Sequence, residues 1–156
     1  MSAPRKALGL GAICGLRSMS GPAFVSRAAA NGSLPLDRTA LSFLGSPRVS
    51  KTLLVMALGE LVVDKLPATP SRTALPPLLG RAASGTLVGA ALFASDGRRV
   101  AAGAVLGSTA AVAAAFAGER LRVLAGEKTG LPDPVVALAG DAIALLGGLR
   151  LLKDVR

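Results

Sequence analysis

The chain has 156 residues, of which 51% are hydrophobic and 17% charged, with a net charge of +9 and a mean hydropathy of +0.57. A soluble domain carries about a quarter charged residues, so this composition predicts an integral membrane protein. The sequence has no histidine and one cysteine, Cys14, which excludes a histidine metal site, a histidine general base and an intrachain disulfide. We interpret Cys14 as a small apolar helix residue and expect no metal and no cofactor.

The positive charge does not indicate a nucleic-acid partner. Basic residues are scattered at the ends of the expected helices, and aromatic residues, on which bases would stack, make up only 3% of the chain. Basic helix ends that face anionic lipid headgroups give a simpler explanation. The partner that the composition predicts is the lipid bilayer.

The first 30 residues resemble a signal peptide, but Arg17 interrupts their apolar run. We predict instead a helix from about Pro4 to Ser20, a stop at Gly21-Pro22, and a short second piece, Pro22–Ala30. The first element is therefore expected to be one broken helix. Arg17 falls in the last turn of its first piece, where a cation suits the helix dipole. Residues 31–45 are expected to form a loop with a short interfacial or re-entrant turn.

The segment SPRVSKTLLVMALGELVVDKLP, Ser46–Pro67, predicts a membrane-length helix with Ser46 as N-cap and Pro47 as its first residue. Its ~30 Å rise matches the bilayer core. Glu60 and Asp64 are four residues apart, so both carboxylates lie on one face of this helix. A charged side chain inside the bilayer core costs roughly 2.5–3.5 kcal/mol of insertion free energy unless it is paired, protonated or hydrated.

Two further helices, from about Pro77 to Ser95 and from about Arg98 to Ala125, are separated by a tight turn at Asp96-Gly97. Each carries a Gly-x-x-x-Gly pattern, which permits close helix packing in membranes. Folding about the turn places Gly89 level with Gly103 and Gly85 level with Gly107. The tail Glu119–Arg122 is expected to be hydrated.

A last helix is predicted from Asp133 to about Leu152, and it carries one acid, Asp141. VMALGELVVDKL at 55–66 resembles VVALAGDAIALL at 135–146, and a proline-interrupted element precedes each. Interrupted segments in corresponding places indicate an internal repeat with a midplane site, although the acids align only after a one-residue shift.

Four parts of the chain match the pattern of one protein family: GLRSMSGP at 15–22, GELVVDKLP at 59–67, Arg72 and GRAASGTLVGA at 80–90. Together they resemble the bacterial membrane proteins catalogued as the domain-of-unknown-function 4126 family. The resemblance covers most of the chain, and its most specific part is the acid-x-x-x-Asp-Lys-x-Pro element. It implies a small polytopic helical membrane protein, and it implies no activity and no catalytic residue.

The sequence thus predicts an all-α fold, a single membrane domain of about five spanning elements over residues 1–156. We expect intramembrane charges to form a polar cluster, or else a purely structural bridge between Arg17 and Glu60 with Asp64 and Lys65 at the interface. The candidate residues are Arg17, Glu60, Asp64, Lys65, Arg81 and Asp141.

Three classes of function remain open at this point. A channel or transporter would use the acids as sites for protons or small ions. A structural or assembly protein would use its Gly/Ala-rich faces to bind itself or another membrane protein. An intramembrane enzyme is the weakest reading, because Glu60, Asp64 and Gly140-Asp141 match no aspartyl motif with a second aspartate.

The sequence predicts a location for the protein but no orientation in the membrane. The expected location is the cell membrane, in particular a bacterial inner membrane. With five spans, Lys and Arg divide almost evenly between the two sides, so the positive-inside rule does not choose an orientation. This weak bias permits dual insertion and an antiparallel homodimer without requiring either.

Overall fold

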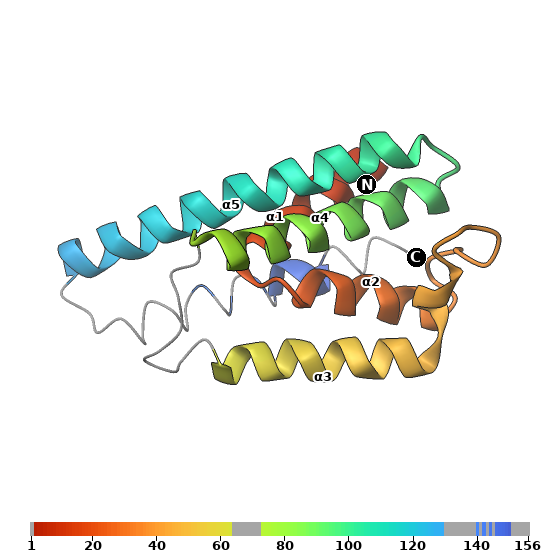
Figure 1. Ribbon diagram of the computed structural model, residues 1–156, viewed down its shortest axis with the longest axis horizontal. Coiled ribbons are helices and arrows are strands. Elements are labelled where there is room, and N and C mark those ends of the chain that lie inside the picture. Colours follow the sequence, from red (N-terminus) through yellow and green to blue (C-terminus); the bar gives the residue numbers. More distant parts are fainter. Residues whose placement is uncertain are drawn as a thin grey trace.

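The computed structural model describes residues 2–63, 73–129, and 140, 142, 144 and 146–150. Over these ranges the chain is all-helical, as predicted, with the elements drawn in Figure 1. The helices are α1 (Ala3–Leu16), α2 (Ser20–Ala30), the 3-10 turn η1 (Ser42–Gly45), α3 (Pro47–Val63), α4 (Leu75–Ser95) and α5 (Val100–Thr129).

Several predicted boundaries lie close to the observed ones. α3 begins at Pro47, as the proline at its first position predicts. The turn at Asp96-Gly97 separates α4 from α5, and Gly97 adopts φ +65°, which glycine reaches without steric cost. The end of α3 predicted near Pro67 lies outside the described residues.

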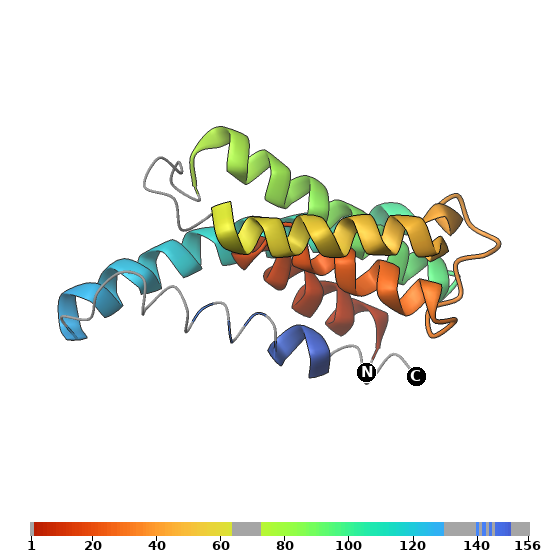
Figure 2. The same cartoon turned by 90° about the horizontal axis from the view of Figure 1, so that it is seen from below.

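The first element differs from the prediction. The chain leaves helical geometry at Arg17, not at Gly21-Pro22, and it then reverses direction. A Cβ built on Gly21 would meet the Cys14 sulfur and lie 3.3 Å from the Leu10 carbonyl oxygen, so α2 packs back along α1. Figures 1 and 2 both show α2 returning beside α1 towards the end at which α1 begins.

The physical reason lies in the first turn of α2. Gly21 and Pro22 are the second and third residues of that helix. The first N–H groups of a helix have no partner within it, so a proline there loses no hydrogen bond. The Gly-Pro pair therefore lies in the first turn of a helix here, and the predicted helix stop at Gly21-Pro22 is wrong.

The α1–α2 hairpin is short compared with a bilayer. α1 has 14 residues and α2 has 11, which correspond to lengths of about 21 Å and 16 Å. The hydrocarbon core of a bilayer is about 30 Å thick. Neither helix of the hairpin is long enough to cross it alone.

A seam of small residues joins α1, α4 and α5. A Cβ on Gly89 would collide with the carbonyl group of Gly103, and one on Gly85 with that of Gly107. α1 meets the same seam, because a Cβ on Gly11 would lie 2.7 Å from the Gly107 carbonyl oxygen. The three helices thus approach backbone to backbone, and α1 runs parallel to α5.

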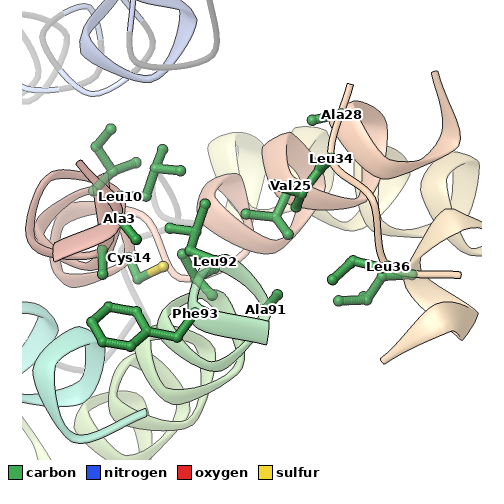
Figure 3. Close-up of a cluster of buried hydrophobic side chains, with 14 of the residues drawn as sticks. Ala3, Leu10, Cys14, Val25, Ala28, Leu34, Leu36, Ala91, Leu92 and Phe93 are labelled. Atoms are coloured by element: carbon green, nitrogen blue, oxygen red, sulfur yellow. The ribbon is translucent and has the colours of Figure 1, made fainter. Parts of the chain in front are cut away.

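The buried core is built from small and medium-sized side chains of several helices. Figure 3 shows Leu10 and Cys14 of α1 beside Leu92 and Phe93 of α4, with Val25 of α2 further along the cluster. The loop after α2 contributes Leu34 and Leu36, so the core continues from the hairpin into the α2–α3 connection.

Two described helices, α4 and α5, are long and apolar enough to cross a membrane. Of the five predicted spans, the described residues therefore support two candidates by length and composition. α3 is a further apolar helix of 17 residues, and most of its large hydrophobic side chains point outward. These side chains are Leu54, Val55, Met56, Leu58, Val62 and Val63.

Candidate functional site at the turn between α1 and α2

Glu60, in the last turns of α3, reaches the turn that joins α1 to α2. Its Oε1 accepts hydrogen bonds from the backbone N–H and the hydroxyl of Ser18, both at 2.8 Å. Its Oε2 accepts one from the backbone N–H of Met19 at 2.9 Å. A single carboxylate thereby satisfies donors at the entrance of α2, where Met19 is the N-cap residue.

Arg17 lies on the other side of the same turn and is 2% exposed. Its Nη1 donates to the backbone carbonyl oxygen of Glu60 at 3.3 Å. The guanidinium thus reaches the main chain of the residue whose carboxylate holds Ser18 and Met19. Arg17 and Glu60 join the hairpin to α3 through both backbone and side chain.

Arg81 approaches the turn from α4 and is 4% exposed. Its Nε donates to the carbonyl oxygen of Gly15 at 3.0 Å. Gly15 lies in the last turn of α1, whose final carbonyl groups have no partner within the helix. Arg81 therefore supplies a hydrogen bond to the C-terminal end of α1 from another helix.

The charges match the two helix ends that meet at the turn. A carboxylate lies at the N-terminus of α2, where the dipole is positive, and a guanidinium lies at the C-terminus of α1, where it is negative. Each such pairing is typically worth 0.3–1 kcal/mol, and up to about 2 kcal/mol when partly buried. The hairpin is thus held at its turn by opposite charges that come from α3 and α4.

Three of the predicted site residues, Arg17, Glu60 and Arg81, converge on this turn. Asp64, Lys65 and Asp141, the other members of the predicted cluster, lie outside the described residues, as does most of segment 135–146, on which the predicted internal repeat depends. In the part of the chain that the structure describes, no group of three or more His, Cys, Asp or Glu is placed to hold a metal ion.

Ser18 and the backbone of Met19 belong to this site but are not among the residues predicted from the sequence. Ser18 precedes the N-cap residue Met19, so it does not occupy the N-cap position that serine favours. The sequence therefore carries no capping signal for Ser18. The Gly15 carbonyl oxygen carries no sequence signal, because any residue would supply it.

Glu119 of α5 also differs from the expectation of a hydrated tail. It is half-buried, and its Oε2 is shielded from solvent without a hydrogen-bond partner among the described residues. A Cβ on the preceding Gly118 would lie 2.7 Å from a methyl group of Leu16, so this part of α5 lies beside the end of α1. Glu119 is thus a second acid close to the hairpin turn.

A family model described as a domain of unknown function, DUF4126, matches residues 6–152. The chain belongs to the DUF4126 family. The match covers the α1–α2 hairpin, Glu60 and Arg81 of this DUF4126 chain. No curated protein and no solved structure matches it. The family description states no activity, so a function has to be argued from the geometry at the hairpin turn.

Proposed function

We propose that this DUF4126 chain is an integral membrane protein in which the α1–α2 turn forms part of a path for protons or small ions. The observation that carries the proposal is a chain reversal held by charged side chains from three elements, of which Arg17 and Arg81 are buried and Glu60 is half-buried. Glu60 comes from α3, Arg81 from α4, and Arg17 from the turn itself.

The depth of the turn supports this proposal. Glu60 is the fourteenth residue of α3, about 20 Å along the helix axis from Pro47. If α3 starts at one surface of a ~30 Å hydrocarbon layer, the turn lies well inside it. Non-helical backbone at that depth occurs only where protein covers it or where it lines a water-filled cavity. Interrupted helices commonly form the binding sites of transporters.

Membrane placement is supported by α4 and α5, which are long and apolar enough to span, and by the outward apolar face of α3. We propose that α3, α4 and α5 cross the bilayer and that the α1–α2 hairpin enters and leaves through one surface. The proposed location is the cell membrane, and specifically the inner membrane of a bacterium, as the family resemblance implies.

Flux through purified protein in liposomes tests the proposal. Proton entry is followed with a trapped pH-sensitive dye, and parallel liposomes loaded with potassium or chloride report other small ions. We expect flux with the wild type and at least a tenfold loss with Glu60→Gln, which keeps the shape of the side chain but removes its charge. Glu127→Gln is the matched control, because Glu127 is an exposed acid near the end of α5.

Wild-type liposomes that pass neither protons nor ions would contradict the transport proposal. Equal flux with wild type and Glu60→Gln would instead exclude Glu60 from the path. Each variant must first elute from size exclusion like the wild type, so that loss of flux is not loss of fold.

A structural role is the second candidate, and one specific observation favours it. The Glu60 carboxylate accepts three hydrogen bonds from the turn, so its acceptor oxygens are already in use. A carboxylate bonded in this way acts as a clamp that fixes the hairpin to α3. In this alternative the liposomes show no flux, and Glu60→Gln lowers thermal stability only.

If the structural role includes binding another copy of the chain, the contact would need a surface other than the glycine seam. Gly85, Gly89, Gly103 and Gly107 pack within the chain. The outward side of α5 carries Val105, Thr109 and Phe116, which are exposed. A homo-oligomer, if it forms, would use that side of α5, and cross-linking between cysteines placed at position 109 would detect it.

A further inference from the structure

One end of the bundle collects most of the basic side chains in the described residues. This basic end comprises the start of α1, the α2–α3 connection with the adjoining helix ends, and the α4–α5 turn. Figure 1 shows these three regions together, on the right of the view. The basic residues there are Arg5, Lys6, Arg27, Arg38, Arg48, Lys51, Arg98 and Arg99.

These side chains are available to a surface outside the protein. All are exposed except Lys6, which is half-buried, and the acids among them are Asp37 and Asp96. In the described part of the opposite end, α5 carries two acids, Glu119 and Glu127, with three basic residues, Arg120, Arg122 and Lys128. Positive charge is thus concentrated at one end, and the charges at the other are mixed.

The chain reversal at the hairpin turn creates this asymmetry. If the first element crossed the membrane in one direction, Arg5 and Lys6 would lie on the side opposite Arg27 and Arg38. Because α2 runs back along α1, both pairs lie at the same end. Among the described residues, the basic side chains are therefore not divided evenly between the two ends, unlike the distribution expected from the sequence.

An aromatic side chain lies among these charges. Phe43, in the η1 turn between α2 and α3, is 50% exposed, between Arg38 and Arg48 in the chain. Exposed aromatic residues at the level of lipid headgroups place an apolar ring in the interface while neighbouring cations meet phosphates. The connection therefore has the chemistry of a segment lying on an anionic bilayer surface.

We infer that the basic end faces the cytoplasm and rests on the anionic headgroups of the inner leaflet. Basic residues in short connections are retained on the cytoplasmic side during insertion, and anionic lipid attracts them there. The inference depends on the membrane placement in the proposed function, and it does not depend on transport. It predicts a single orientation, and it excludes an equal mixture of two.

Accessibility of single cysteines tests the orientation. The native Cys14 is fully buried, so the wild type gives the background labelling. Ala40→Cys places a thiol at the basic end, and Gly126→Cys places one on α5, at a position with no atoms within 4 Å of an added Cβ. A membrane-impermeant maleimide is applied to intact bacterial spheroplasts and to inside-out vesicles.

We expect Gly126→Cys to react in spheroplasts and Ala40→Cys to react only in inside-out vesicles, each by at least tenfold over the wild type. The reverse pattern, or equal labelling of both variants in both preparations, would overturn the inference. A chain that is released from membranes by alkaline carbonate would instead contradict the membrane placement in the proposed function.

Binding of anionic lipid to the basic end is tested by a separate measurement of thermal stability. Adding phosphatidylglycerol to the detergent-solubilised wild type should raise its unfolding temperature above that with phosphatidylcholine. The double variant Arg38→Glu/Arg48→Glu should lose most of that increase, and Arg120→Glu at the opposite end should keep it. An equal increase in all three proteins would refute headgroup binding at the basic end.

Discussion

The carboxylate of Glu60 and Ser18 are joined by two hydrogen bonds of 2.8 Å although they lie 42 residues apart in the chain. One bond comes from the serine hydroxyl and the other from its backbone N–H. Together with the bond from Met19, they fix the point at which the chain turns from α1 into α2. The side chain of one residue of α3 thereby links that helix to the turn between α1 and α2.

Removal of the carboxylate should destabilise the hairpin. Glu60→Ala leaves the half-buried N–H groups of Ser18 and Met19 without their acceptor, and a fully buried unpaired donor costs about 1–3 kcal/mol, which is an upper bound for each. We expect a clear fall in the unfolding temperature of the protein in detergent, measured by circular dichroism. Glu127→Ala, at an exposed position of α5, is the control and should change it little. An unchanged unfolding temperature for Glu60→Ala would show that the turn is not held by this residue.

Arg17 and Glu60 should be energetically coupled. Arg17→Ala removes the bond to the Glu60 carbonyl oxygen and a buried guanidinium, so we expect a loss of about 1–3 kcal/mol in the free energy of unfolding. Glu60→Ala keeps that carbonyl oxygen, so the expected coupling arises because both side chains hold the same turn. In a double-mutant cycle, Arg17→Ala with Glu60→Ala should cost less than the sum of the single changes by about 0.5 kcal/mol or more. Strict additivity would mean that the two residues act independently.

The seam between α4 and α5 should not accept a methyl group. Gly89→Ala places a Cβ against the Gly103 carbonyl group, and overpacking of this kind costs roughly 1–3 kcal/mol. Gly80→Ala, on the same helix, meets no atom within 4 Å and should be neutral or slightly stabilising, because alanine favours helices more than glycine. Thermal unfolding of both variants in one detergent gives the comparison. A Gly89→Ala protein as stable as Gly80→Ala would contradict the close approach of the two helices.

The half-buried carboxylate of Glu119 should lower the stability of the folded protein. Its Oε2 is shielded from solvent and has no hydrogen-bond partner in the described part of the chain, which leaves a desolvation cost of about 1–3 kcal/mol. We expect Glu119→Leu to raise the unfolding temperature, whereas Glu127→Leu on the exposed tail should not. A rise in stability together with a loss of liposome flux would place Glu119 in the conduction path. A fall in stability would show that the carboxylate has a partner in the membrane-embedded protein.

Local features of the fold could be predicted from the sequence because each depends on the backbone preference of one or two residues. Pro47 marks the start of α3, and Asp96-Gly97 marks the turn before α5, since only particular residues fit those positions. The spacing of Gly85 and Gly89 from that turn follows from helical periodicity. The all-helical class follows from the long apolar segments, which have no alternating pattern.

The direction of the first element was decided only by the tertiary structure. Gly21 and Pro22 fit a helix stop and a first helical turn equally well, so local preference does not distinguish a broken span from a hairpin. The donors of Glu60 were also beyond the sequence, because Ser18 and Met19 reach it only after α2 folds back beside α1 and α3 packs on the pair. Composition and capping residues determined which segments are helices; packing between distant helices determined which charges meet, because a buried charge takes whatever partner the fold brings within hydrogen-bond distance.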